Sequence, residues 1–470
     1  MLFNSPIFLF AFAPLFFTIY FSLKPSLRNP FIVASSIAFY AWGEPSFIGV
    51  VLFSAATDWF IGNALYQSNH ERKKRSLLAF GICLNVAVLA YFKYAGFFVD
   101  NLNDLLLNLN LTPFPALTIA LPIGVSFIVF EKITYLVDIH RKLGPPAASI
   151  TSYLLYVLLF PKLLAGPIVK YHDICNQLRA RTPQLEDVIE GLFRFLIGLG
   201  KKVLLADTMQ EAVDQVFALS AADLGTLNAW LGMVCFTLQI YFDFSGYSDM
   251  AIGLARMMGF RLLENFNRPY TATSITEFWR RWHISLSTWI REYLYIPLGG
   301  NRVAAWRMYC NLWMCFVLCG LWHGASWTFV FWGMFHGGLL IIDKVWWLEI
   351  QKTLPRFLNV LTTFLLVMFG WVIFRAESLD QALFYFQALL GQTSSKGTFI
   401  YLGNNVKAAM AAGLLICFLP AIPWLERWKS SMTALPWKQE CQLGLALVLL
   451  IVSVAKISIT TFNPFMYFRF

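Results

Sequence analysis

Charged residues are scarce in this sequence of 470 residues. They make up 13% of the chain, whereas hydrophobic residues make up 58%. Soluble domains contain roughly 45–50% apolar and about 25% charged residues, because polar side chains must cover a surface that faces water. The shortage of charge therefore excludes an ordinary soluble protein. A lipid bilayer needs no polar cover, so the composition predicts an integral membrane protein.

Several motifs of soluble enzymes are also missing. The sequence has no P-loop pattern, which argues against ATP-driven work, and no Gly-x-Ser-x-Gly motif for a hydrolase-type serine nucleophile. The cysteines form no Cys-x-x-Cys pair, and no histidine is spaced to complete a zinc site with Cys315 and Cys319. We expect no bound metal. No internal repeat or low-complexity tract marks a boundary, so residues 1–470 are expected to form one domain.

Basic residues exceed acidic ones by 36 to 26, which gives a formal net charge of +10. Such an excess can indicate nucleic-acid binding, but here the basic residues form short clusters between apolar stretches. The clearest cluster is Glu71–Arg75, which the positive-inside rule places in the cytoplasm. Lys24 and Arg28 directly follow the first apolar stretch, so the N-terminus is expected outside. We expect membrane lipid as a partner and no nucleic acid.

Apolar stretches recur from one end of the sequence to the other. A spanning helix needs about 20 mostly apolar residues, and several of these stretches are shorter or interrupted. We expect an all-α polytopic fold with roughly nine to twelve transmembrane helices, the remaining stretches being re-entrant or interfacial. The stretches cover residues 7–23, 30–43, 46–66, 77–99, 117–139, 150–169, 188–206, 227–246, 308–322, 325–347, 356–375, 404–425 and 441–459.

The segment between residues 249 and 307 is rich in Arg, Trp, Asn and Pro, although both its flanks are apolar. Ser274 and Glu277 have the spacing of a capping box, so a helix is expected to begin there and to continue to about residue 295. On one continuous helix Arg280 and Arg291 would lie on nearly the same side, apart from a stripe of tryptophans. Such an amphipathic helix suits an interface or the wall of a cavity.

Histidines occur where ionisable side chains are costly. His323 stands in an apolar stretch, and an ionisable residue there usually faces a cavity or the bundle interior. Histidine transfers protons near neutral pH; a buried histidine bonded to a backbone carbonyl is the structural alternative. His283, beside Arg280 and Arg281, is the second candidate and is explained equally well as an interfacial polar residue. His336 is expected to be structural or to form a separate cavity wall.

Two further polar positions need an explanation. Asp243 lies at the end of an apolar stretch and is expected to form a structural ion pair with an arginine or histidine near residue 280. Asn301 and Arg302 follow two glycines. They are placed to contact an anionic ligand, and snorkelling of the arginine to lipid headgroups is an equally good account.

These residues occur in segments that resemble the MBOAT family, the membrane-bound O-acyltransferases, and within it the bacterial alginate O-acetylation branch. The resemblance extends over nearly the whole chain. It implies helices around a central funnel, with a near-invariant family histidine that corresponds to His323 and a second one that corresponds to His283. The segments that carry it are Tyr241–Leu254, Glu264–Tyr270, Ser274–Arg302 and Gly320–Gly324, with weaker similarity at Leu121–Ser126, Phe160–Pro167, Gly370–Arg375 and Pro464–Phe468.

The resemblance also implies an activity. Acetyl groups would move from a cytoplasmic donor, expected to be acetyl-CoA, to an exported polysaccharide, most closely alginate, through a periplasmic acetyltransferase partner. The chain would be a multi-pass protein of the bacterial inner membrane that works with polysaccharide export or synthesis machinery and holds no permanent cofactor. Related branches serve cellulose, peptidoglycan or teichoic acid. A transporter of acyl or glycan groups is the alternative class, although the inverted repeats typical of transporters are absent.

Under this hypothesis His323 acts as general base on an acceptor hydroxyl, or becomes acetylated itself. His283 would orient the donor or the acceptor. The candidates for binding the donor are Arg280, Arg281, Arg291, Asn301 and Arg302.

Overall fold

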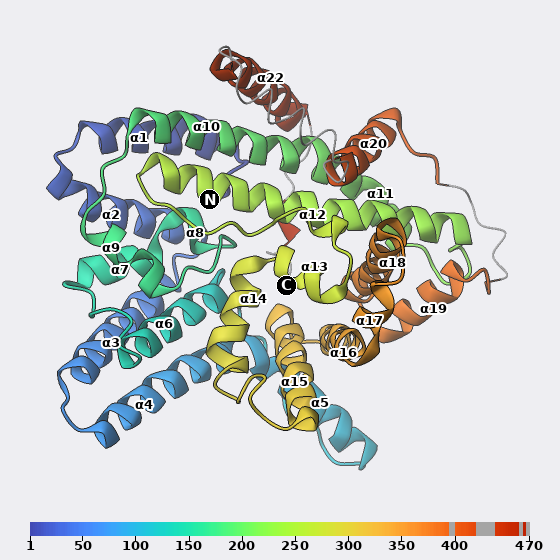
Figure 1. Cartoon of the computed structure of the whole chain (residues 1–470), viewed down its shortest axis with the longest axis horizontal. Coiled ribbons are helices and arrows are strands. Elements are labelled where there is room, and N and C mark those ends of the chain that lie inside the picture. The colour runs from blue at the N-terminus through green and yellow to red at the C-terminus, as the bar shows by residue number, and fades with distance from the viewer. Residues whose placement is uncertain (394–399, 420–437, 460–463, 467–470) are drawn as a thin grey trace. The chain divides into compact units, whose positions relative to one another are not determined.

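The computed structural model describes residues 1–393, 400–419, 438–459 and 464–466 of the chain. Helices are the only regular secondary structure in these residues, as the composition predicts (Figure 1). The chain separates into two compact units, described in turn below. Unit 1 consists of Met1–Gly191 and Ala251–Leu263, and unit 2 of Leu192–Met250 and Glu264–Phe470. A single functional domain over residues 1–470 stays a prediction.

Unit 1 is a bundle of helices in which the long helix α6 is largely enclosed. Most residues of α6 are buried, because it packs against α3, α4, α7 and α9. Two helices, α10 (Leu185–Gly200) and α12 (Thr226–Met257), have residues in both units. The other elements of unit 1 are η1 (Phe8–Phe12), α1 (Ala13–Ser22), α2 (Pro25–Gly43), α3 (Ile48–Gln67), α4 (Glu71–Leu89), η2 (Ala90–Tyr94), α5 (Ala95–Asn108), α6 (Val125–His140), α7 (Ile150–Leu158), α8 (Phe160–Leu163) and α9 (Tyr171–Arg179).

The buried charges of α6 are neutralised in pairs. Glu131 forms an ion pair with Lys162 of α8. Its neighbour Lys132 lies 3.1 Å from the carboxylate of Asp58 on α3, and Asp58 also accepts a hydrogen bond from the Asn85 amide at 2.9 Å. Removing one partner of such a pair leaves an uncompensated buried charge. The pairs therefore explain how ionisable residues are held inside an apolar bundle.

Unit 2 holds the candidate residues of the sequence analysis. Its central feature is the pair of neighbouring helices α15 (Ala305–His323) and α16 (Trp327–Ile342), which pack along each other (Figure 1). The other elements are η3 (Lys201–Ala206), α11 (Asp207–Phe217), η4 (Pro269–Thr271), α13 (Ile275–Arg281), α14 (Ile284–Ile290), η5 (Arg291–Tyr295), η6 (Asp343–Trp347), α17 (Leu348–Gln351), α18 (Arg356–Arg375), α19 (Leu379–Leu389), α20 (Asn404–Phe418) and α22 (Lys438–Ile459).

Two glycines allow α15 and α16 to approach until their backbones touch. A Cβ atom at Gly320 would collide with the carbonyl oxygen of Phe329, and one at Gly333 would collide with the carbonyl oxygen of Phe316. Small residues are enriched at helix contacts in membranes for this reason. The contact fixes the tight turn between the helices, and His323 is the last residue before that turn.

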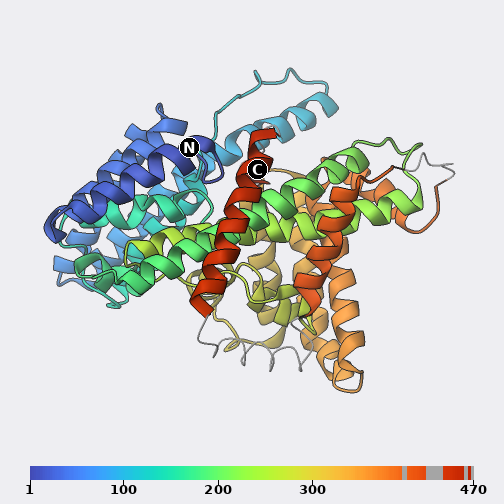
Figure 2. The ribbon, with the colours of Figure 1, turned by 90° about the horizontal axis from the view of Figure 1, so that it is seen from above.

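The membrane prediction is confirmed by helices of sufficient length and apolarity. Among the described residues, five such helices cover Ile48–Gln67, Glu71–Asn108, Trp327–Gln351, Arg356–Arg375 and Glu440–Ile459, and shorter apolar helices cover Phe8–Ser22 and Asn404–Phe418. The helix α22 is the long red helix of Figure 2, and its Leu443, Val448 and Ile451 side chains are more than half exposed. Lipid is the medium that would cover such side chains. The expected number of crossings stays a prediction.

The expected continuous helix from residue 274 to about 295 is wrong, although its start is confirmed. The Ser274 hydroxyl accepts the Glu277 backbone N–H at 3.0 Å, which caps α13. After α13 the chain breaks at His283, whose φ is +44°, and then forms α14 and η5. The reason is a distant segment: the Asn265 carbonyl accepts the Ile284 N–H at 3.0 Å and replaces a bond within the helix. Periodicity cannot reveal such a long-range competitor.

We expect Gly333→Ala to lower the thermal midpoint of unfolding of the purified protein in detergent. The added methyl group would push α16 away from the Phe316 carbonyl, and overpacking of this kind costs about 1–3 kcal/mol. Gly338→Ala on the same helix is the matched control, because a Cβ there meets no described atom within 4 Å. Equal midpoints for the two variants would contradict the close backbone contact.

Candidate active site

His323 lies at the C-terminal end of α15 inside an aromatic enclosure. Its side chain is largely shielded, with the residue only 7% exposed. The imidazole centroid is 4.9 Å from the ring of Trp322, 5.1 Å from Trp332 and 5.3 Å from Phe374. Apolar rings on several sides give a low-dielectric environment, in which interactions with developing charge are stronger than in water.

One cavity, cavity 1, approaches His323 from the side of Phe374. It has a volume of about 380 Å³ and is lined by α11, α12, the start of α16, the end of α18 and the segment from Pro464 to Met466. Phe374 lines the cavity and contacts the imidazole. The polar and charged lining residues are Gln210, Asp214, Gln239, Asp243, Ser326, Thr328, Arg375 and Glu377.

A second cavity, cavity 2, approaches from the side of α13 and α14. Its volume is about 410 Å³, and its lining combines apolar residues of α14, α15 and α16 with Arg280, Arg291 and Lys344. Trp279 also lines this cavity and lies 5.6 Å from Trp332, the ring next to His323. The described lining of cavity 2 contains three cations and no carboxylate.

His323 itself lines neither cavity. Phe374 stands between the imidazole and cavity 1, and Trp332 with Trp279 stands between the imidazole and cavity 2. The imidazole thus contacts the wall of cavity 1 through one aromatic side chain and that of cavity 2 through two.

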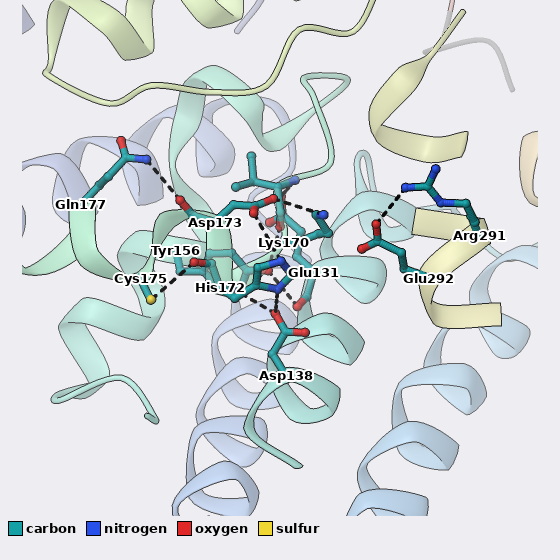
Figure 3. Close-up of polar contacts among 11 residues, drawn as sticks. Glu131, Asp138, Tyr156, Lys170, His172, Asp173, Cys175, Gln177, Arg291 and Glu292 are labelled. Atoms are coloured by element: carbon teal, nitrogen blue, oxygen red, sulfur yellow. Dashed lines mark hydrogen bonds and ion pairs between the residues drawn. The ribbon is translucent and has the colours of Figure 1, made fainter. Parts of the chain in front are cut away.

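The candidate donor-binding residues divide into two groups. Arg280, Arg291 and Asn301 meet at cavity 2 even though the helix between the arginines is broken. Arg291 also pairs with Glu292 at 3.0 Å, as Figure 3 shows. Arg302 is exposed and is not part of the cavity lining.

Arg281 is held away from both cavities. It forms an ion pair with Glu277 one turn earlier and donates to the Thr271 hydroxyl at 3.0 Å. Burial alone would raise the pKa of the Glu277 carboxyl, but hydrogen bonds from Thr273 and the charge of Arg281 hold it below its ordinary value. The pair is therefore charged and stabilises the start of α13.

His283 is completely buried at the break between α13 and α14. Its Nδ1 atom lies 3.1 Å from the Asn265 side-chain oxygen, which also accepts the N–H of Ser285 at 3.2 Å and its hydroxyl at 3.0 Å. The ring lies 6.2 Å from that of Trp322, which neighbours His323. His283 lines neither cavity, so its contact with the site runs through Trp322.

Asp243 does form a buried ion pair, but the expected partner near residue 280 is wrong. Lys202 of η3 lies 2.6 Å from its carboxylate. The Met466 backbone N–H donates to the other oxygen at 2.9 Å, and Lys202 also donates to the Pro464 carbonyl at 3.2 Å. The carboxylate thereby anchors the Pro464–Met466 segment in the wall of cavity 1. Neither contact follows from the local sequence, because both partners are distant in the chain.

His336 is buried on α16 and lines neither cavity. The Trp279 indole N–H donates to its Nδ1 atom at 3.4 Å. A Cβ at Gly370 would lie 2.6 Å from its Nε2 atom, so α18 packs directly on the ring. This placement fits a structural role.

Unit 1 contains another polar cluster around His172 (Figure 3). Its Nδ1 atom lies 2.8 Å from Asp138 and its Nε2 atom 3.3 Å from Asp173, while Asp173 also pairs with Lys170 at 3.5 Å. Asp138 in addition accepts the His172 backbone N–H at 3.0 Å. Both ring nitrogens are thus engaged by carboxylates, and the cluster joins α6 to α9. It offers no nitrogen for proton transfer with a substrate.

Sequence reasoning missed several residues of the site. Asn265 belongs to a segment that carries the family resemblance, yet nothing local shows that it contacts His283. Lys344 and Gln239 lie in apolar helices. A polar residue in such a helix is often functional, and this feature of the sequence could have identified both. Among the described residues, no group of three or more His, Cys, Asp or Glu side chains could hold a metal ion.

Comparison with known proteins places these observations in context. The family model of the membrane-bound O-acyltransferases, MBOAT, matches residues 140–384. The chain is 40% identical to the probable alginate O-acetylase of Pseudomonas putida over all of both chains. It is 46% identical to the probable alginate O-acetylase of Azotobacter vinelandii over 81% of this chain and 76% of that protein. It is 37% identical to the peptidoglycan O-acetyltransferase of Helicobacter pylori over 83% of this chain and 80% of that protein.

We expect Asn265→Ala to destabilise the protein by about 1–3 kcal/mol, because it removes a buried acceptor shared by His283 and Ser285. Thermal unfolding in detergent measures the effect. Asn267→Ala, two residues away at an exposed position, should unfold like the unmodified chain. A loss no larger than that of Asn267→Ala would show that the hydrogen bonds around His283 do not hold this turn.

Proposed function

The chain belongs to the membrane-bound O-acyltransferase family, and on that premise we propose that it takes acetyl groups from acetyl-CoA for the O-acetylation of an exported polysaccharide. Alginate is the first candidate, since two relatives that share 40% and 46% identity are named probable alginate O-acetylases. The chain is a membrane acyltransferase, and we propose the bacterial inner membrane as its location. The observation that carries the proposal is that His323 contacts the aromatic walls of two cavities, one with three lining cations and one whose described lining has no unpaired cation.

Cavity 2 suits an anionic donor. Acetyl-CoA carries phosphate groups, and Arg280, Arg291 and Lys344 offer guanidinium and ammonium donors to them from one lining. The apolar part of the same lining reaches Cys319, one helical turn before His323. We propose that the phosphates bind at the cations while the thioester end extends toward the histidine.

Cavity 1 suits the acceptor. Its lining cation, Arg375, already pairs with Asp214 at 3.1 Å. Hydroxyl, amide and carboxylate groups supply the rest of its polarity, and such groups form hydrogen bonds with an alcohol. Donor and acceptor would then approach His323 from different cavities.

In the proposed reaction His323 acts as the general base. Its Nε2 atom accepts the proton of the acceptor hydroxyl while the oxygen attacks the thioester carbonyl carbon. The carbon–sulfur bond breaks as the carbon–oxygen ester bond forms, and the imidazolium returns the proton to the CoA thiolate. The aromatic enclosure keeps water out, and the imidazolium stabilises the negative charge that develops on the carbonyl oxygen. An acetylated histidine, formed in a first half-reaction, is the alternative route.

Access to His323 requires movement of aromatic side chains. Phe374 would turn away to open cavity 1, and Trp332 or Trp279 to open cavity 2. Side-chain rotations of this kind need no change in the helices that carry them. If the two sides open at different times, the acetyl group passes while water and CoA do not.

The partners follow from the same premise. The relatives are named as probable alginate O-acetylases and a peptidoglycan O-acetyltransferase, so we propose that this chain works with polysaccharide synthesis or export machinery and a periplasmic acetyltransferase. Peptidoglycan is the second candidate polymer, because the Helicobacter relative is a peptidoglycan O-acetyltransferase, and cellulose is the third. A transporter that forms no ester would release labelled acetyl-CoA unchanged, which separates it from the enzyme.

We expect His323→Gln to reduce acetyl transfer from radiolabelled acetyl-CoA by about 10²–10⁴-fold in membranes that contain equal amounts of protein. Glutamine keeps a polar side chain of similar length but cannot accept and return the proton. His70→Gln, at an exposed position in unit 1, should retain full activity. Activity of the His323 variant near that of the control would remove this histidine from the mechanism.

We also expect Arg280→Gln and Arg291→Gln to raise the KM for acetyl-CoA about ten-fold or more. Each loses a hydrogen bond between charged groups, worth about 1.5–3 kcal/mol. Steady-state kinetics at varied donor concentration would measure this, with Arg302→Gln as the control because Arg302 is exposed outside the cavity lining. An equal KM in all three variants would place the CoA phosphates elsewhere.

A further inference from the structure

We propose that Pro464–Met466 form a strap that positions the acyl acceptor in cavity 1, and that Asp243 and Lys202 are the positioning residues that hold this strap in place. The inference rests on the proposed function, because that function assigns cavity 1 to the acceptor. It follows from the hydrogen bonds of the strap, from the burial of the residues that anchor it, and from the cavity that it shares with Phe374.

The strap contacts the cavity and the helix bundle through different residues. Pro464 and Met466 line cavity 1, whereas Phe465 between them does not belong to its described lining. Phe465 is only 1% exposed, and its ring lies 4.9 Å from that of Tyr247 on α12 in an edge-to-face arrangement, which aromatic pairs prefer. Phe465 therefore fixes the strap to α12, and its two neighbours form part of the cavity wall.

Charged side chains hold the backbone of the strap. The Met466 N–H donates to the Asp243 carboxylate at 2.9 Å, and the Lys202 ammonium group donates to the Pro464 carbonyl at 3.2 Å. Buried backbone groups need hydrogen-bond partners, and here two residues from distant parts of the chain supply them. Because the two bonds lie on either side of Phe465, they fix both ends of the strap.

The two anchors are themselves held by ion pairs. Lys202 lies 2.6 Å from Asp243 and 2.8 Å from Asp207, and its Nζ atom lies 4.6 Å from the centroid of the Phe465 ring, within the range of a cation–π contact. Lys202 and Asp243 are both buried. Buried charges are stable only when they are paired and hydrogen-bonded. A movement of the strap would break these bonds, so the charges hold it in one position.

The position of the strap connects it to the reaction. Pro464 and Met466 line the same cavity as Phe374, and the Phe374 ring contacts that of His323 at 5.3 Å between centroids. An acceptor in cavity 1 is therefore bounded by the strap and lies beside the ring that contacts the general base. Transfer is fast only when the reacting atoms are held in the correct geometry. A displaced strap would widen the cavity and hold the acceptor hydroxyl less well.

The test measures acetyl transfer by the full-length chain in proteoliposomes, with labelled acetyl-CoA as donor and a short mannuronate oligosaccharide as a small form of the first candidate acceptor. Asp243→Leu removes the acceptor of the Met466 N–H. We expect it to raise the KM for the oligosaccharide about three- to ten-fold. The KM for acetyl-CoA should not change, because neither the strap nor its anchors line cavity 2. Asp243→Asn should recover most of the effect, since it keeps an oxygen for the N–H and leaves Lys202 paired with Asp207.

A second variant separates the strap from the charge of Asp243, which itself lines cavity 1. Phe465→Ala removes the contact with Tyr247 and changes neither the described lining residues nor the two anchors. We expect it to raise the KM for the oligosaccharide by a similar factor and to leave the KM for acetyl-CoA unchanged. If Phe465→Ala fails to insert into the membrane, Phe465→Leu replaces it, with a smaller rise expected.

Asp249→Leu is the matched control, because Asp249 is an ion-paired carboxylate on the same helix, bound to Arg194 and Lys201, and lines neither cavity. The inference is overturned if the Phe465 variant keeps the acceptor KM of the unmodified chain. It is also overturned if Asp243→Leu raises both KM values alike, or if Asp249→Leu raises the acceptor KM as much, since either result would show a general loss of structure. Consumption of acetyl-CoA by the unmodified chain without acetylation of the oligosaccharide would overturn it as well. A chain that never consumes acetyl-CoA would instead contradict the proposed function.

Discussion

The contact between α15 and α16 is the constraint on which the site depends. Because Gly320 and Gly333 carry no side chain, the two backbones touch, and Trp332 of α16 lies over the imidazole at the end of α15. Larger residues there would separate the helices and expose His323 to lipid or water. A polar ring in an apolar bundle is costly unless the surrounding structure holds it in place. The helix contact supplies that support.

Charge distinguishes the two approaches to His323. The lining of cavity 2 combines three cations with apolar walls, whereas every lining carboxylate of cavity 1 except Glu377 is paired with a cation. Under the proposed function this arrangement would let one histidine serve two chemically different reactants. In the proposed function each reactant would be selected by the cavity through which it approaches, and the aromatic rings would keep the cavities apart.

A structural feature could be predicted from the sequence when the residues that form it are close together in the chain. Membrane character and helical class follow from composition, and the start of α13 follows from the spacing of Ser274 and Glu277. The pairing of Asp243 with Lys202, and the replacement of a helical bond by the Asn265 carbonyl, join residues that are distant in the chain. No periodicity contains that information. Arg280 and Arg291 were expected to share one side of a straight helix. They do line the same cavity, but the chain bends between them at His283.

The positive φ of His283 has a consequence for how this residue is studied. Left-handed backbone is unfavourable for most side chains, and asparagine tolerates it better than alanine. His283 therefore has two separable roles: its backbone forms the bend between α13 and α14, and its imidazole makes the side-chain contacts. Replacement by alanine would disturb both at once, and a loss of activity would then say little about the imidazole. Asparagine, which relaxes the backbone penalty while removing the ring, isolates the chemical contribution at this bend.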